Sequence, residues 1–133
     1  MAAPQRRSLT LQFLDGEYAI CRVAADAPVS WADGELVSIV QARPDAMLTT
    51  VICRAAAVPP HVDHDPGWRL LRLVGPFGFG ETGVLASVLA VLADAGVPVL
   101  TVCTFETDYV LFKSPRPDRV RRALEEAGHA FVA

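Results

Sequence analysis

Positive charge is sparse in this sequence and is not concentrated anywhere along it. Among 133 residues there are 12 lysines and arginines against 15 aspartates and glutamates, which gives a net charge of -3. Lys113 is the only lysine, and the arginines are scattered rather than gathered into a stripe. Proteins that bind nucleic acid use clustered cations to neutralise successive phosphates. The composition therefore argues against nucleic acid as a partner.

Long uninterrupted apolar runs are also absent. The longest candidate, VLASVLAVLADAGVPVL, contains Asp94, Gly96 and Pro98, which is typical of a helix followed by a strand. The pair Arg6 and Arg7 is followed by alternating apolar and polar residues rather than by the apolar core of an export signal. We therefore expect a cytoplasmic protein with no membrane partner.

Cysteine is scarce, and its three copies are far apart. Cys21, Cys53 and Cys103 each lie in an apolar stretch. An odd number of widely spaced cysteines fits neither a disulfide framework nor a metal knuckle. We expect three buried, reduced thiols.

Side chains that could bind a metal or catalyse a reaction are poorly arranged. The segment HVDHD contains His61, Asp63, His64 and Asp65, which are competent ligand types. Its flanking prolines and lack of periodicity are more typical of a solvated linker. His129 follows the end of an expected helix, where a cation complements the helix dipole. The sequence thus predicts no metal, no cofactor and no catalytic residue.

Strand and helix patterns alternate from Trp68 onward. Short apolar or β-branched runs are separated by two longer segments of helical character, each closed by a glycine. The tight turn FETD leaves room only for a hairpin between the second and third strands. This β-α-β-β-α-β order predicts an α+β, ferredoxin-like fold in which the third strand lies antiparallel between the first two. The expected strands are 68–75, 97–105, 109–113 and 129–133, and the expected helices are 82–96 and a helix within 114–129 that has a proline in its first turn and ends before Gly128.

The loop after the first of these strands contains the motif G-x-G-x-x-G. Gly78, Gly80 and Gly83 stand between a strand and a helix, as in a dinucleotide-binding fingerprint. That fold needs a parallel strand after each helix, whereas here the second strand turns back through a hairpin. Because the first two strands run parallel, the glycine loop and the hairpin should share one edge of the sheet. We therefore expect Asp108, at the start of the third strand, to face the glycine loop.

The stretch GWRLLRLVGPFGFGETGVLASVLAVLADAGVPVLTVCTFETDYVLFK resembles the ACT domains. It is most similar to bacterial amino-acid-binding ACT proteins related to the CASTOR-type arginine sensors, and GEYAICRVAADAPVSW and VSIVQARPDAMLTTVIC extend the resemblance into the first half. The resemblance implies an ACT domain at 66–133 packed beside a degenerate ACT-like half at 6–60. In that half we expect no long amphipathic helix, strands at 9–14, 17–23, 35–42 and 47–54, and a linker at 55–65.

The resemblance also implies an amino-acid site where the glycine loop of one half meets a strand or loop of a neighbour. Gly78 and Gly80 would let the backbone approach the ligand. The ligand carboxylate would bind first-turn N–H groups around Glu81, Thr82 and Gly83, where the helix dipole favours an anion. This end of the site is predicted to hold negative charge.

The opposite end of the ligand would meet an acidic side chain. Asp108 is expected to bind the α-ammonium group, and Thr104 to offer a hydroxyl or a backbone contact. Phe79 or Phe105 would form a wall of the pocket. Glu81 has two interpretations, because it could complement the helix dipole or face a cationic ligand side chain such as arginine or lysine.

We therefore expect a regulatory or sensor protein that binds a free amino acid and is not an enzyme. The helix segment 83–93 has no charge and is apolar nearly all round, so it should be buried on more than one face, against the first half or a second chain. Together with the resemblance, this favours a homodimer. Two alternatives stay open: a ligand-free structural or oligomerisation module, and a nucleotide-binding protein that uses Gly78–Gly83.

Overall fold

The chain forms two compact units, and two long strands pass from one unit into the other. The computed structural model describes residues 7–75, 77 and 82–132. The smaller unit is Asp15–Trp68, and the larger unit comprises residues 1–14 and 69–133. Strands β1 (Thr10–Ala24) and β4 (Asp63–Leu73) each contribute to both units. The units differ from the predicted domains 6–60 and 66–133 because the start of β1 belongs with the C-terminal residues.

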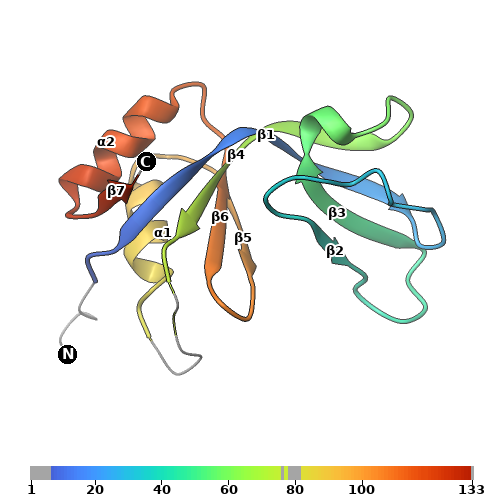
Figure 1. Ribbon diagram of the computed structural model, residues 1–133, viewed down its shortest axis with the longest axis horizontal. Helices are drawn as coiled ribbons and strands as arrows, with labels where there is room; N and C mark the ends of the chain where they lie inside the picture. Colours follow the sequence, from blue (N-terminus) through green and yellow to red (C-terminus); the bar gives the residue numbers. More distant parts are fainter. Residues whose placement is uncertain (1–6, 76, 78–81, 133) are drawn as a thin grey trace. The chain divides into compact units, whose positions relative to one another are not determined.

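The larger unit has the predicted order of elements (Figure 1). After β4 the chain forms α1 (Ala86–Asp94), β5 (Val99–Cys103), β6 (Asp108–Phe112), α2 (Pro117–Glu126) and β7 (Ala130–Val132). Strand β6 lies between β4 and β5 and is antiparallel to both. The hairpin and the helical crossover that the sequence predicted are thereby confirmed, and β4 and β5 run parallel to each other.

The N-terminal strand joins this sheet in a way that the sequence analysis did not predict. The first residues of β1 pair in parallel with β7, with Thr10 opposite Ala130. The N–H of Val74 donates to the carbonyl of Thr10 over 2.9 Å. The strand order in this unit is therefore β7-β1-β4-β6-β5. Strand β1 occupies the place beside β4 that the last strand of a four-stranded ferredoxin-like sheet would take.

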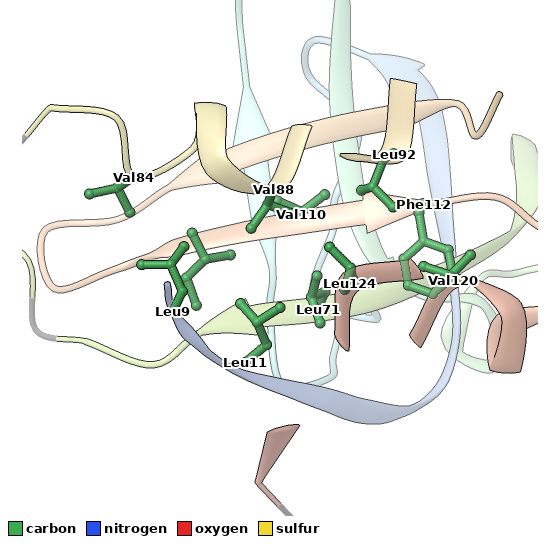
Figure 2. Packing of buried hydrophobic residues seen from close by; sticks show 11 residues of the cluster. Leu9, Leu11, Leu71, Val84, Val88, Leu92, Val110, Phe112, Val120 and Leu124 are labelled. Atoms are coloured by element: carbon green, nitrogen blue, oxygen red, sulfur yellow. The ribbon is translucent and has the colours of Figure 1, made fainter. Parts of the chain in front are cut away.

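Both helices of this unit pack against one face of the sheet, and the hydrophobic core lies between the helices and that face (Figure 2). Side chains at alternate positions of the strands point to this face, as a pleated strand requires. Phe13 stacks on Phe131 with 4.8 Å between ring centroids and meets Phe112 edge-on at 5.6 Å. The buried cluster consists of Leu9, Leu11, Leu71, Leu73, Val84, Val88, Leu92, Val110, Phe112, Val120 and Leu124.

Helix α2 has the limits and the amphipathic character that its sequence indicates. Pro117 occupies the first turn, where its missing N–H has no intrahelical acceptor to lose, and Gly128 lies just beyond the end with φ of 100°. Val120 and Leu124 are buried, and the charged residues of the helix are exposed. The predicted surface helix is confirmed.

Helix α1 is shorter than predicted. It begins at Ala86, after a turn at 84–85, rather than at residue 82. Val88 and Leu92 are buried on the side that faces the sheet, whereas Ala86 and Ala93 are exposed. Burial on several faces is therefore not seen within the described chain. None of the helices in the described residues has the length and apolar content that a membrane crossing requires.

His129 holds the N-terminal segment against the rest of the larger unit. His129 is only 6% exposed, and its Nδ1 accepts a hydrogen bond from the N–H of Leu9 over 3.1 Å. Nε2 lies 2.9 Å from the carbonyl oxygen of Ser87. Because the N–H of Leu9 can only donate, Nδ1 is the unprotonated nitrogen and Nε2–H donates to Ser87. The predicted role of His129 as a cation at a helix end is therefore wrong.

The smaller unit is built from strands. Residues 15–68 are all described and contain no α-helix, as the sequence indicated; besides their parts of β1 and β4 they form β2 (Ser38–Val40), β3 (Leu48–Arg54) and the 3-10 helix η1 (Ala55–Ala57). Strand β3 pairs antiparallel with β1 and with β2. Two expectations are corrected: the strands expected at 9–14 and 17–23 are one strand that continues through Gly16, and the expected linker 55–65 already includes the start of β4.

A small core lies on one face of this second unit. Val23, Val51 and Val62 belong to its buried cluster, and residues of the loop 25–37, among them Ala27 and Trp31, pack against it partly buried. The loop therefore covers sheet surface that a helix covers in the larger unit. This replacement explains why the first half shows no helical periodicity.

Two of the three cysteines are buried, as predicted. Cys21 and Cys53 lie in the core of the smaller unit, where burial raises the pKa of Cys21 to about 12 and also raises the pKa of Cys53. Cys103 is exposed, which corrects the prediction. It ends β5, an edge strand of the larger unit, so among the described residues no strand pairs with one side of it.

Candidate functional site

The end of β4 and the turn between β5 and β6 lie together at one edge of the larger unit (Figure 1). The N–H of Phe77 donates to the carbonyl of Glu106 over 3.3 Å. The hydroxyl of Thr107 donates to the carbonyl of Leu73, the last residue of β4. The segment that leads into the glycine-rich loop is therefore bonded to the hairpin turn. For the described residues this confirms the shared edge that the parallel direction of β4 and β5 predicted.

The hairpin turn is stabilised by its own side chains. The hydroxyl of Thr104 donates to the carbonyl of Thr107 over 2.9 Å and accepts from the N–H of Thr107 over 3.2 Å. The hydroxyl that was expected to contact a ligand is thus engaged in the turn, and Thr104 acts here as a turn residue. Phe105 is 75% exposed at the tip.

Asp108 opens β6 on the sheet face that carries the helices. It precedes Val110 and Phe112 by two and four residues, and side chains at these spacings share a face of a strand. Cys103 lies opposite Asp108 in the register of β5 and β6. A hydrogen bond between the Cys103 thiol and the Asp108 carboxylate raises the pKa of Cys103, and partial desolvation of the otherwise exposed residue raises it further. A half-buried carboxylate therefore stands at the edge where the hairpin turn meets the end of β4.

Four of the predicted ligand-binding residues, Gly78, Phe79, Gly80 and Glu81, lie outside the described residues. Their part in the site stays a prediction.

The start of α1 is described from Thr82 onward. Thr82 is exposed, and Gly83 is half-buried. The carbonyl of Gly83 accepts from the N–H of Ser87 over 3.1 Å and from its hydroxyl over 2.6 Å. The bond from the N–H of Ser87 to the carbonyl of Gly83 is the first backbone bond of the helix. Residues 84–86 therefore form its first turn, and their N–H groups have no intrahelical acceptor. The first helical turn thus lies just beyond Gly83, and the expected part of Thr82 and Gly83 in binding a ligand stays a prediction.

Sequence reasoning missed two residues at this edge, Cys103 and Arg72. Arg72 lines a hollow of about 280 Å³ together with Gly75 and Glu106. Its Nε is buried and has no hydrogen-bond partner in the described part of the chain. The alternating pattern of β4 puts Arg72 on the face opposite the core residues Leu71 and Leu73. Only the register of the strands could have related either residue to Asp108.

The HVDHD segment does not form a metal site in the described residues, where no group of three or more histidine, cysteine, aspartate or glutamate side chains could hold a metal. The carboxylate of Asp63 accepts from Arg22 over 2.6 Å, and that of Asp65 accepts from the indole N–H of Trp68 over 3.0 Å. His64 bonds a backbone carbonyl through Nδ1 at 2.8 Å. These side chains therefore have partners within the protein.

Comparison with known proteins identifies the class of this fold. The ACT domain profile matches residues 63–126, from the start of β4 to the end of α2. Residues 63–126 thus form an ACT domain. A solved structure of a protein from Agrobacterium tumefaciens is 34% identical, and the alignment covers 95% of this chain and 93% of that one with a TM-score of 0.83. The chain belongs to the same family as that protein.

More distant structures share the fold. A protein of unknown function from Vibrio cholerae is 18% identical over 91% of both chains, with a TM-score of 0.66. The regulatory subunit of aspartate kinase from Thermus thermophilus is 13% identical over 86% of this chain and 93% of that one, with a TM-score of 0.61. At these identities the likeness describes architecture alone.

Proposed function

We propose that this chain is a regulatory protein without catalytic activity that binds a free amino acid where the β5–β6 turn meets the end of β4. ACT domains are commonly regulatory domains that bind small molecules. The observation that carries the proposal is the place of Asp108, a half-buried carboxylate on the helix-covered face at this edge. The contact between Phe77 and Glu106 brings the segment before the glycine-rich loop to the same edge.

The two ends of an amino acid have different partners in this proposal. Asp108 accepts hydrogen bonds from the α-ammonium group, and N–H groups at the glycine-rich loop and the start of α1 donate to the carboxylate. Each charge-assisted hydrogen bond contributes about 1.5–3 kcal/mol, and the helix dipole about 0.3–1 kcal/mol. Micromolar affinity corresponds to about 8 kcal/mol after association costs. The ligand side chain must therefore add apolar or polar contacts of its own.

The side chain of Glu81 decides between two ligand classes. If Glu81 faces the ligand, a cationic amino acid such as arginine or lysine is favoured, as the similarity to the CASTOR-type sensors suggests. If it complements the helix dipole instead, a neutral amino acid is favoured. A thermal-shift panel of free amino acids distinguishes the two, because only the first predicts that arginine or lysine gives the largest shift.

Replacement of Asp108 by asparagine should strongly weaken binding of the preferred amino acid. The side chain keeps its shape but loses the charge that pairs with the ammonium group, so affinity should fall at least about tenfold to a hundredfold. Isothermal titration calorimetry with the amino acid selected from the panel measures the change. Asp94→Asn is the matched control, because Asp94 is an exposed acid at the other end of α1 and should leave affinity unchanged.

Two outcomes would reject parts of this proposal. Undiminished affinity in Asp108→Asn would remove Asp108 from the site. A complete lack of response to every amino acid would favour the ligand-free structural module, in which Asp108 only bonds Cys103 and the turn is stabilised by Thr104. Binding of a nucleotide by the wild-type protein would support the remaining alternative.

Cys103 reports on the charge of Asp108 without any ligand. Because the hydrogen bond to the Asp108 carboxylate raises the pKa of the Cys103 thiol, little thiolate is present at pH 8. Asp108→Asn removes the carboxylate, so the pKa should fall and alkylation by iodoacetamide at pH 8 should become severalfold faster. Mass spectrometry of the intact protein follows the reaction. Buried Cys21 and Cys53 should stay unmodified in both proteins, and an unchanged rate would mean that the two side chains do not interact.

A homodimer is part of the proposal. The exposed alanines of α1, Ala86 and Ala93, lie on its outer side, and the helix carries no charge before Asp94 at its C-terminal end, so this side is suited to packing against a second copy. We expect size-exclusion chromatography with light scattering to give twice the monomer mass of 14.3 kDa at micromolar concentration. Ala86→Glu should give monomers if α1 forms the interface, and a wild-type protein that is monomeric would contradict the assignment.

A further inference from the structure

The edge of the sheet in the smaller unit carries exposed apolar side chains. Strand β2 pairs with β3 on one side, and none of the described residues forms a strand on its other side (Figure 1). Ile39 and Val40 are 55% and 53% exposed, and Val37, just before the strand, is 42% exposed. A further strand added at this edge would bond the outward N–H and carbonyl groups of β2 and would cover these side chains.

This edge lacks the features by which soluble proteins keep an edge strand from pairing with another chain. Such strands usually carry a charge, a proline or a bulge, or lie under another segment. The segment 36–42, LVSIVQA, contains no charged residue, no proline and no glycine. Its exposed apolar side chains show that no other segment covers it within the described residues. The edge is therefore suited to pairing with a strand of another molecule.

Charged residues of opposite sign stand at equal distances on either side of this segment. Glu35 comes four residues before Ile39, Arg43 comes four residues after it, and both are exposed. If a second copy of β2 runs antiparallel with Ile39 opposite Ile39, each Glu35 comes to the end that carries Arg43 of the other copy. A parallel copy would instead bring like charges together at both ends.

Both charged side chains can take a partner from another molecule. The guanidinium of Arg43 lies 3.6 Å from the carboxylate of Asp45, and these side chains are 72% and 84% exposed. An exposed pair of this kind contributes little to stability, so Arg43 can exchange its partner at small cost. The N–H of Glu35 donates to the hydroxyl of buried Tyr18 over 2.8 Å, which fixes the backbone there while the residue stays exposed.

We propose that β2 of one copy pairs antiparallel with β2 of a second copy, so that the sheet of the smaller unit continues across a two-fold axis into the same strands of its partner. The axis passes beside Ile39, and an ion pair between Glu35 and Arg43 closes each end of the contact. An order of acidic, apolar and basic residues is complementary to itself under such an axis. This self-complementarity makes a second copy of this chain the occupant of the edge.

The contact is different from the others described above. Residues 35–43 lie outside the segment 63–126 that matches the ACT domain, and α1 belongs to the larger unit, so neither the amino-acid site nor the α1 contact is involved. A strand of three residues with its flanking side chains is small beside the roughly 1,200–2,000 Å² of a stable interface. We therefore expect association through β2 at about 0.1–1 mM, above the concentration at which the α1 contact forms.

Charge reversal tests the proposal by sedimentation velocity. The variants are made in Ala86→Glu protein, in which the α1 contact is disrupted, and are compared up to about 1 mM. The parent should associate into dimers of twice 14.3 kDa. Glu35→Arg and Arg43→Glu should each weaken the association at least about tenfold, because each places like charges at both ends of the contact. An equimolar mixture of the two should associate as tightly as the parent, because unlike charges then meet at both ends.

Recovery in the mixture cannot come from a variant that has failed to fold, so the mixture is also the control for folding. Ile39→Lys should prevent association, because the two lysines would meet at the axis. Val132→Lys is its matched control, because Val132 is 43% exposed in the larger unit and should leave association unchanged. The proposal is overturned if the parent stays monomeric at about 1 mM, if the mixture associates no better than its components, or if the two lysine variants behave alike.

Discussion

Replacing His129 by alanine should lower the free energy of unfolding by about 3 kcal/mol. The imidazole accepts from the N–H of Leu9 and donates to the carbonyl of Ser87, and the residue is 6% exposed. Alanine leaves both backbone groups buried without a partner, at about 1–3 kcal/mol each, less what water entering the space recovers. The N-terminal segment is also held through Arg7, whose N–H donates to the hydroxyl of Ser87 over 2.8 Å, so the change at position 129 removes one of two neighbouring ties.

Urea denaturation followed by circular dichroism measures this change as a shift of the midpoint. His64→Ala is the control, because His64 is exposed and should change stability by less than about 0.5 kcal/mol. His129→Asn can still accept from Leu9 and His129→Gln can still reach Ser87, so each should recover part of the loss. If alanine at position 129 cost no more than alanine at position 64, the ring would not be a structural tie.

In the larger unit, sequence signals that depend on neighbouring residues were enough to predict the order of helices and strands. Pro117, Gly128 and the FETD turn fixed the element order correctly, because helix starts, helix ends and hairpins depend on residues that are neighbours in sequence. The right-handed crossover rule then placed β6 between β4 and β5 without any further information. The place of Asp108 at the edge of the sheet followed from that topology alone.

Those local sequence signals could not predict which strands pair when the strands are far apart in the sequence. Thr10 pairs with Ala130, and nothing near either residue names a partner about 120 positions away. The alternation of LTLQF predicts a strand with one buried face, but it fits any sheet edge of suitable register. The role of His129 depends on the same pairing, since Leu9 reaches the ring only because β1 enters the C-terminal sheet.

The candidate site was predicted in part for the same reason. Asp108 could be found because strand direction decides which loops share an edge. Cys103 and Arg72 could not be found in this way. Their relation to the site depends on the pairing register of their strands and on the face of the sheet to which each side chain points. The loop 25–37 that covers the sheet of the smaller unit left no periodic signal, since a loop that replaces a helix has no period to detect.

Replacing Gly34 by alanine should destabilise the smaller unit by about 2–3 kcal/mol. Gly34 has φ of 130°, a conformation that residues with a side chain rarely adopt. An added methyl group would lie 2.8 Å from the hydroxyl oxygen of Tyr18 and 3.3 Å from Cβ of Arg54. Tyr18 cannot move aside easily, because it is buried and its hydroxyl accepts from the N–H of Glu35.

Gly96→Ala provides a matched control for this change. Gly96 also has a positive φ, 71°, but a methyl group there would meet nothing within 4 Å, so only backbone strain of about 1 kcal/mol is expected. Urea denaturation should therefore rank the variants Gly34→Ala, Gly96→Ala and wild type in order of rising stability. Limited proteolysis should in addition cut the loop 25–37 faster in Gly34→Ala only, because that loop depends on the Tyr18 contact. Equal losses in the two variants would show that strain alone acts at Gly34 and that the packing against Tyr18 does not hold the loop.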